Sequence, residues 1–137
     1  MECAAATHQA VWVAIRVLVV DDSQHFRRHV CELLMLRGLE VVDTAADGED
    51  ALAAVVRACP DGVLLDINLP GRDGYAVAAS LAAICPAAKI VLTSSDVDEV
   101  PTAVLLECGA TAFVPKTDLA TLDLRLLFGG GFGHLNE

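Results

Sequence analysis

Charged and hydroxyl side chains follow several short apolar runs of this chain, and together they could form a chemical site. They are Asp21 and Asp22, Asp66, the run Thr93-Ser94-Ser95, and Lys116. Carboxylates that lie close together repel each other unless a positive charge compensates them. Mg²⁺ prefers carboxylate, carbonyl and water oxygens, and a lysine adds a second positive charge. Such a set is typical of a site that holds a phosphoryl group on one carboxylate while a hydroxyl orients it.

Each of these residues also has a simpler interpretation, because an aspartate or serine at the end of a strand often only caps the turn that follows. A chemical site needs all of the residues at one edge of one sheet, whereas caps can lie anywhere. The strands and helices of the chain therefore decide between the two interpretations.

Short apolar runs alternate with amphipathic segments along the chain. We expect strands over residues 15–20, 39–43, 62–66, 89–93 and 111–115. We expect helices over residues 24–37, 48–59, 74–84, 97–108 and 119–128, with Leu52, Val55 and Val56 of the second helix facing inward. This alternation predicts an α/β fold: a five-stranded parallel sheet with helices on both faces. In such folds ligands bind at the carboxyl ends of the strands, where the polar residues above are found.

The composition excludes some classes of function. A net charge of −10 and only nine basic residues argue against nucleic-acid binding by this chain. The most apolar window, residues 10–20, contains Arg16 and is about half as long as a membrane span. No signal-peptide pattern precedes it, so we expect a cytoplasmic protein without membrane contact. The five cysteines form no CxxC pair, and we interpret them as reduced structural residues.

Four segments around these residues resemble the signature segments of response-regulator receiver domains, the flavodoxin-like modules of two-component signalling. They are VLVVDDS at 17–23, LLDINLPGRDG at 64–74, VLTSS at 91–95 and GATAFVPK at 109–116. Their common order and spacing carry the resemblance. It implies a (βα)5 receiver domain over residues 15–128, with an N-terminal extension at 1–14 and a flexible tail or linker stub at 129–137.

The resemblance implies that Asp66 accepts a phosphoryl group from a sensor histidine kinase or a phosphotransfer protein. Asp21 and Asp22 match the acidic pair that holds Mg²⁺, and Asp66 and the backbone carbonyl of Asn68 complete the metal site. Apart from its own phosphotransfer and dephosphorylation, the family module catalyses no reaction. We therefore expect a signalling protein that is not an enzyme.

The same resemblance assigns three further positions. Lys116 matches the lysine that pairs with the phosphoryl group. The family's hydroxyl residue corresponds to Ser94, fifteen residues before Gly109, and the adjacent Thr93 stays an alternative. Phe113 lies at the position of a switch aromatic, although a core residue on the last strand explains it equally well. A switch implies a downstream protein partner on the face of the fourth helix, fifth strand and fifth helix, and a homodimer is left open.

Alternatives stay open at this point. Thr117 follows Lys116 where many relatives have proline, a difference that receivers fused to DNA-binding domains often share. The chain could therefore be the receiver part of a longer DNA-binding transcriptional regulator. An aspartyl-phosphate hydrolase fits less well, because it needs a second aspartate where this chain has Asn68. We further predict that Asn68 and Asp96, each two residues past a site residue, line the approach of a hydrolytic water.

Overall fold

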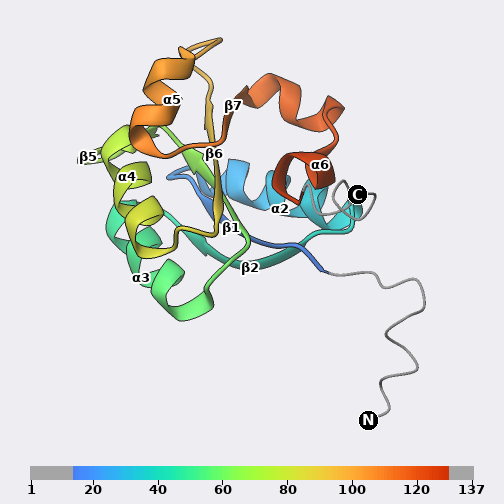
Figure 1. Ribbon diagram of the computed structural model, residues 1–137. Helices are drawn as coiled ribbons and strands as arrows, with labels where there is room; N and C mark the ends of the chain where they lie inside the picture. The colour runs from blue at the N-terminus through green and yellow to red at the C-terminus, as the bar shows by residue number, and fades with distance from the viewer. Residues whose placement is uncertain (1–13, 130–137) are drawn as a thin grey trace, which may run out of the picture.

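The computed structural model describes residues 14–129, in which a five-stranded parallel sheet lies between two layers of helices (Figure 1). Across the sheet the strands are β2 (Glu40–Ala45), β1 (Arg16–Val20), β3 (Gly62–Asp66), β6 (Lys89–Ser94) and β7 (Ala112–Pro115). The helices are α2 (Gln24–Leu36), α3 (Gly48–Ala58), α4 (Gly74–Ile84), α5 (Thr102–Cys108), the 3-10 helix η1 (Lys116–Thr121) and α6 (Leu124–Phe128). The predicted α/β fold is confirmed.

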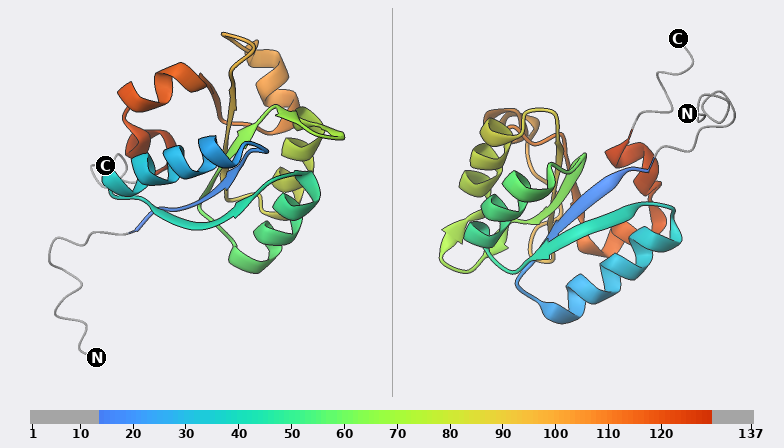
Figure 2. Two further views of the ribbon diagram at one scale, coloured as in Figure 1. Left: turned by 180° about the vertical axis from the view of Figure 1, so that it is seen from behind. Right: turned by 90° about the horizontal axis from the view of Figure 1, so that it is seen from below.

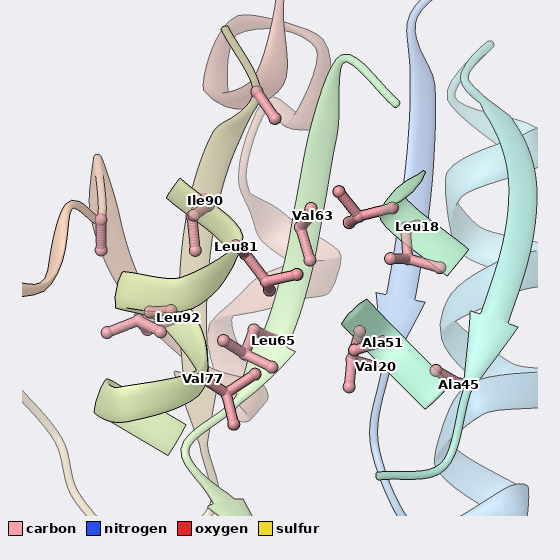
Figure 3. Packing of buried hydrophobic residues seen from close by; sticks show 14 of the residues in the cluster. Leu18, Val20, Ala45, Ala51, Val63, Leu65, Val77, Leu81, Ile90 and Leu92 are labelled. Carbon is pink, nitrogen blue, oxygen red and sulfur yellow. The ribbon is translucent and has the colours of Figure 1, made fainter. Parts of the chain in front are cut away.

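Alternate residues of the central strands pack on opposite faces of the sheet, and each face has its own helices (Figure 2). Leu18 and Val20 of β1 pack with residues of α3 and α4, among them Leu81 (Figure 3). Val17 and Val19 of the same strand pack on the other face with residues of α2, η1 and α6. Burial on both faces explains why the strand sequences are apolar almost without interruption.

Side-chain caps fix where the helices begin after the strands. Ser23 Oγ accepts a hydrogen bond from the N–H of Phe26 at the start of α2, and Asp73 accepts one from Tyr75 at the start of α4. These bonds satisfy N–H groups that have no partner inside the first helical turn. The chain can therefore turn sharply from the end of β1 into α2.

A short antiparallel ladder, which the sequence did not predict, follows Asp66 and redirects the chain into α4. It consists of β4 (Asn68–Leu69) and β5 (Arg72–Asp73). Gly71 in its turn has a φ of +75°, which glycine adopts without steric cost. At Gly74 a Cβ atom would lie 2.4 Å from the carbonyl oxygen of Ile67, so the close return of the chain requires glycine.

Two of the predicted helices have different boundaries. α5 begins at Thr102 rather than at residue 97, because Pro101 is its N-cap and the residue before a proline avoids helical backbone. The expected helix over 119–128 is divided into η1 and α6. The division occurs where the side chain of Asp123 accepts a hydrogen bond from the N–H of Leu126 and caps a new helix.

Two smaller expectations were also inaccurate. Val56 is 65% exposed rather than inward-facing, because the buried face of α3 runs through Ala51, Ala54 and Val55. The second strand extends to Ala45, two residues beyond the predicted end at residue 43.

The remaining expectations concern the chain ends, the membrane and the cysteines. The proposed extension and tail lie outside the described residues, except for Ala14 and Gly129. Over residues 14–129 the structure contains no helix that is long and apolar enough to cross a membrane. Within the same range all of the cysteines are free thiols; they are Cys31, Cys59, Cys85 and Cys108.

Candidate functional site

The ends of neighbouring strands bring the predicted site residues to one edge of the sheet. Asp21 follows β1, Asp66 is the last residue of β3, and Lys116 follows β7. Ser94, the last residue of β6, pairs in register with Pro115, which precedes Lys116. Because all of these strands are parallel, their carboxyl ends lie together and residues far apart in sequence become neighbours.

Three carboxylates form the centre of this site. Asp21, Asp22 and Asp66 each offer an oxygen within 4.8 Å of the others. Asp21 and Asp66 are buried, with exposed fractions of 0% and 4%, whereas Asp22 is exposed. Asp21 Oδ1 accepts a hydrogen bond from the N–H of Ser23 at 2.9 Å. The site is thus closed on the protein side and open to solvent at Asp22.

Lys116 supplies the positive charge that faces these carboxylates. Its Nζ atom lies 2.7 Å from Asp21 Oδ2 and 3.5 Å from Asp66 Oδ2. Asp21 Oδ2 is buried and, among the residues that the structure describes, has this ion pair but no hydrogen bond of suitable angle. That oxygen therefore keeps the capacity to accept a further partner.

Burial raises the pKa of Asp66 to about 6. Loss of hydration of the carboxylate is the largest cause, and the neighbouring charge of Asp21 acts in the same direction. The backbone N–H of Asn68, which donates to Asp66 Oδ1 at 3.1 Å, and the Lys116 ammonium both oppose the rise. At neutral pH the Asp66 carboxyl is therefore mostly ionised and available as a nucleophile.

The two adjacent hydroxyl residues of β6 make different contacts. The Thr93 hydroxyl donates to the carbonyl oxygen of Val114 at 2.7 Å, inside the sheet. Ser94 Oγ instead accepts from the Asn68 side-chain amide at 3.3 Å and from the Asp96 N–H at 2.9 Å. The structure thus brings Ser94 next to the site residues and directs the Thr93 hydroxyl to β7.

The structure also places the remaining predicted residues. The Asn68 amide donates to Asp96 Oδ2 at 2.8 Å, so these two exposed side chains lie together beside Ser94. Phe113 pairs in register with Leu92 and is half-buried against the core cluster that includes α4 and α5 residues.

One neighbour of the site was missed at the sequence level. The ring of Phe26 lies under Lys116, with Nζ 4.1 Å from the ring centroid. The sequence placed Phe26 on the apolar face of the first helix, and its spacing gave no signal of a contact with a residue near the other end of the domain.

The residues present fit a divalent cation. Two buried carboxylates and an exposed one form a set of hard oxygen donors, and one oxygen of the buried Asp21 carboxylate has no hydrogen bond among the described residues. Mg²⁺ and Ca²⁺ prefer such donors to nitrogen or sulfur. The coarse expectation of an acidic metal-binding pocket is therefore consistent with the structure.

The fold and this arrangement define a receiver-type module, and comparison with known proteins gives the family. The model of the response regulator receiver domain matches residues 17–126, so the chain belongs to this family. Among solved structures, the signal receiver domain of a NarL response regulator from Mycobacterium tuberculosis has a TM-score of 0.73 and 31% identity, covering 88% of this chain and 98% of that chain. The response regulator domain of CheB from Thermotoga maritima has a TM-score of 0.68 and 26% identity, and the match covers 90% of this chain and 95% of that chain.

Curated relatives carry a different kind of name. The chain is 45% identical over 118 residues to protein-glutamate methylesterase/protein-glutamine glutaminase 5 of Myxococcus xanthus. The matched segment covers 84% of this chain and 34% of the relative. A protein of the same name from Archaeoglobus fulgidus is 39% identical, covering 80% and 32%. The chain therefore spans about a third of the length of these relatives.

These names correct one expectation. The sequence analysis predicted a protein that is not an enzyme, on the ground that a receiver domain only accepts and loses a phosphoryl group. That prediction was wrong, because the relatives are named as enzymes and this chain matches only a part of their length.

Proposed function

We propose that the chain is a phosphorylation-dependent switch in which Asp66 accepts a phosphoryl group from a sensor histidine kinase or a phosphotransfer protein. The observation that carries the proposal is the position of Lys116 Nζ, 3.5 Å from Asp66 Oδ2, in a buried site that also holds Asp21. A caps-only interpretation gives no reason for a lysine to meet two buried carboxylates at the end of the sheet.

In the proposed step a carboxylate oxygen of Asp66 attacks the phosphorus of the donor. A P–O bond forms while the bond from phosphorus to the donor's histidine nitrogen breaks, and the electron pair stays on that nitrogen. Lys116 is close enough to neutralise the oxygens of the phosphoryl group on Asp66. Ser94 can then exchange its present contacts for a hydrogen bond that its hydroxyl donates to one of these oxygens.

We assign a bound Mg²⁺ to the carboxylates of Asp21, Asp22 and Asp66 and the backbone carbonyl of Asn68. When bound, it would supply positive charge to the oxygens of the phosphoryl group. Asp22, which is exposed, gives the site its open side, whereas the burial of Asp21 and Asp66 limits the water that competes for the charges.

Ser94 and Phe113 connect the site to the proposed output. A hydroxyl drawn towards the phosphoryl group vacates space into which the half-buried Phe113 ring can rotate, and this changes the face formed by α5, β7 and η1 with α6. A downstream protein partner would bind this face in the cytoplasm.

A second candidate concerns the protein that contains this domain. The 45% identity to a methylesterase relative favours a receiver that regulates a methylesterase region of the same protein. Immunoblotting of cells that produce the domain tests this candidate. A band about three times as large as the 14.4 kDa of this chain supports it, whereas a band at 14.4 kDa excludes it.

Mass spectrometry after incubation with acetyl phosphate and Mg²⁺ tests the main proposal. The protein should gain the mass of one phosphoryl group, and Asp66→Asn should gain none. Asp98→Asn is a matched control, because Asp98 is an exposed carboxylate in the loop that follows β6. Normal labelling of Asp66→Asn, or no labelling of the parent protein, would reject the assignment.

A further inference from the structure

The Phe26 ring is an electrostatic neighbour of Lys116 as well as an apolar one. The distance of 4.1 Å from Nζ to the ring centroid lies within the range at which a ring face attracts a cation. The Lys116 side chain is only 17% exposed, so little water competes for its charge. Phe26 belongs to the first turn of α2 and Lys116 follows β7, so the contact joins the two ends of the fold.

A closed series of contacts fixes this ring with respect to the site. The N–H of Ser23 donates to Asp21 Oδ1 at 2.9 Å, and the N–H of Phe26 donates to Ser23 Oγ at 3.1 Å. Asp21 Oδ2 in turn lies 2.7 Å from Lys116 Nζ, above the Phe26 ring. Asp21 therefore holds the lysine by charge and the start of α2 through Ser23.

The Lys116 ammonium has to be held in place while its N–H groups stay free to donate hydrogen bonds to phosphoryl oxygens. Its side chain has a flexible four-carbon stem, and its ammonium has three N–H donors. A further carboxylate or carbonyl neighbour, in addition to Asp21, would hold the ammonium by accepting a hydrogen bond from another of these N–H groups. A ring face attracts the charge without taking a conventional hydrogen bond, so it restrains the ammonium and leaves the donors for anionic oxygens.

We propose that Phe26 is a positioning residue, which keeps Lys116 between Asp21 and Asp66 through the attraction between its ring face and the ammonium group. The proposal rests on the proposed function of Asp66 as the phosphoacceptor. Phe26 also packs against the core cluster that contains α2 and α6 residues, so its loss would disturb packing as well. Only the positioning role depends on the electron density of the ring.

Fluorinated phenylalanines incorporated at position 26 separate the two roles, because fluorine withdraws electron density from the ring with little change in its shape. We expect the rate of phosphorylation by acetyl phosphate and Mg²⁺ to fall with each added fluorine, by about 3- to 10-fold at three fluorines. The stability of the unphosphorylated protein, measured by denaturant unfolding, should fall along the same series. In the Lys116→Met background, which keeps the side-chain length without the charge, the fall in stability with added fluorine should disappear.

Phe128 provides the matched control, since it is a buried phenylalanine of the same core cluster and belongs to α6. Fluorination there should change unfolding equally in the parent and Lys116→Met backgrounds. The positioning role would be overturned if the rate or the stability did not depend on the number of fluorines at position 26. It would also be overturned if the fall in stability persisted in Lys116→Met. If the unmodified protein accepts no phosphoryl group, the proposed function fails, and the unfolding series still decides whether the ring and Lys116 attract each other.

Discussion

The side-chain amide of Asn68 donates a hydrogen bond to Asp96 Oδ2 over 2.8 Å and so links the start of β4 to the loop after β6. The same amide lies 3.3 Å from Ser94 Oγ. The backbone N–H of Asn68 also donates to Asp66 Oδ1, so this residue lies beside the proposed phosphoacceptor. We predict that the small polar side chains of Asn68 and Asp96 line the approach of the hydrolytic water.

We expect this pair to set the lifetime of the phosphorylated state. Asp96→Lys should slow the loss of phosphate about 3- to 10-fold, because a long cationic side chain displaces the water and pairs with the phosphoryl oxygens. Asn68→Leu should also slow it by removing the polar partners of the water. Phosphate release after removal of the phosphodonor measures the rate, with Asp98→Lys as the control for added charge. Unchanged rates in both site variants would contradict the water-placement account.

The raised pKa of Asp66 predicts a pH-dependent cost of folding in metal-free buffer. A folded-state pKa of about 6, against 3.8 for a free aspartate, means that the folded protein holds this proton more tightly than the unfolded chain. The resulting stabilisation is present below pH 4 and is lost as the pH rises through 6. Asp66→Asn, which is always neutral, should match the parent at pH 4 and exceed its free energy of unfolding by about 3 kcal/mol at pH 8.

Urea unfolding of both proteins between pH 4 and pH 8 measures this difference. Titrating groups that lie far from Asp66 are common to the two proteins and cancel in the comparison. A constant difference across the whole range would show that Asp66 ionises without penalty in the folded state.

The contacts of the acidic pair predict unequal roles in Mg²⁺ binding. Both oxygens of Asp21 already have neighbours, the Ser23 N–H and Lys116 Nζ, whereas Asp22 is exposed and has none of these contacts. Asp22→Ala should therefore weaken Mg²⁺ binding more than Asp21→Ala, by about tenfold or more. Isothermal titration with Mg²⁺ compares the two variants, and equal affinities would argue against the assignment. Addition of EDTA should abolish phosphorylation by acetyl phosphate in the parent protein.

The environments of Ser94 and Phe113 predict a coupled movement on activation. With beryllofluoride as a phosphoryl mimic, the ring resonances of Phe113 and the amide resonances of α5 should shift in the NMR spectrum. Ser94→Ala should reduce these shifts, because no hydroxyl is drawn to the mimic. Thr93→Val is the comparison variant, since its hydroxyl is bonded to Val114. Shifts that are identical in the parent and Ser94→Ala would show that Phe113 is only a core residue.

The chain path after Asp66 predicts the effect of a glycine substitution. Gly74→Ala should destabilise the protein by about 2 kcal/mol or more, because the new Cβ meets backbone atoms of Ile67 at 2.4–2.7 Å. Gly71→Ala should cost only about 1 kcal/mol, since its φ is positive but no atom lies within 4 Å of the added carbon. Thermal unfolding of both variants measures the difference. A smaller loss at Gly74 than at Gly71 would contradict the described return of the chain.

The core of the fold and the meeting of the site residues at one edge of the sheet could be predicted from the sequence, because both follow from patterns within short segments. The apolar runs before Asp21 and Asp66 end abruptly in charge, and a parallel sheet brings such ends together whatever the details of its helices. The start of α5 was harder to predict, because the apolar pattern from Val97 onwards suggested a helix, while Pro101 delays it to Thr102.

The contacts within the site could not be predicted in the same way. Adjacent residues of a strand point in opposite directions, so Thr93 and Ser94 cannot both reach the site, but only the sheet register shows that the Thr93 hydroxyl bonds to β7. The contact of Phe26 with Lys116 depends on the packing of α2 beside the end of β7. No spacing within either segment encodes it.

During synthesis on the ribosome Asp21 emerges long before Lys116, because one follows the first strand and the other follows the last. A nascent chain that has folded only as far as β6 holds the acidic residues without their lysine. The final segment must then dock on α2, where Arg37 donates hydrogen bonds to the carbonyl oxygens of Ala120 and Leu122. Only a finished domain therefore sets a positive charge against the buried carboxylates of Asp21 and Asp66.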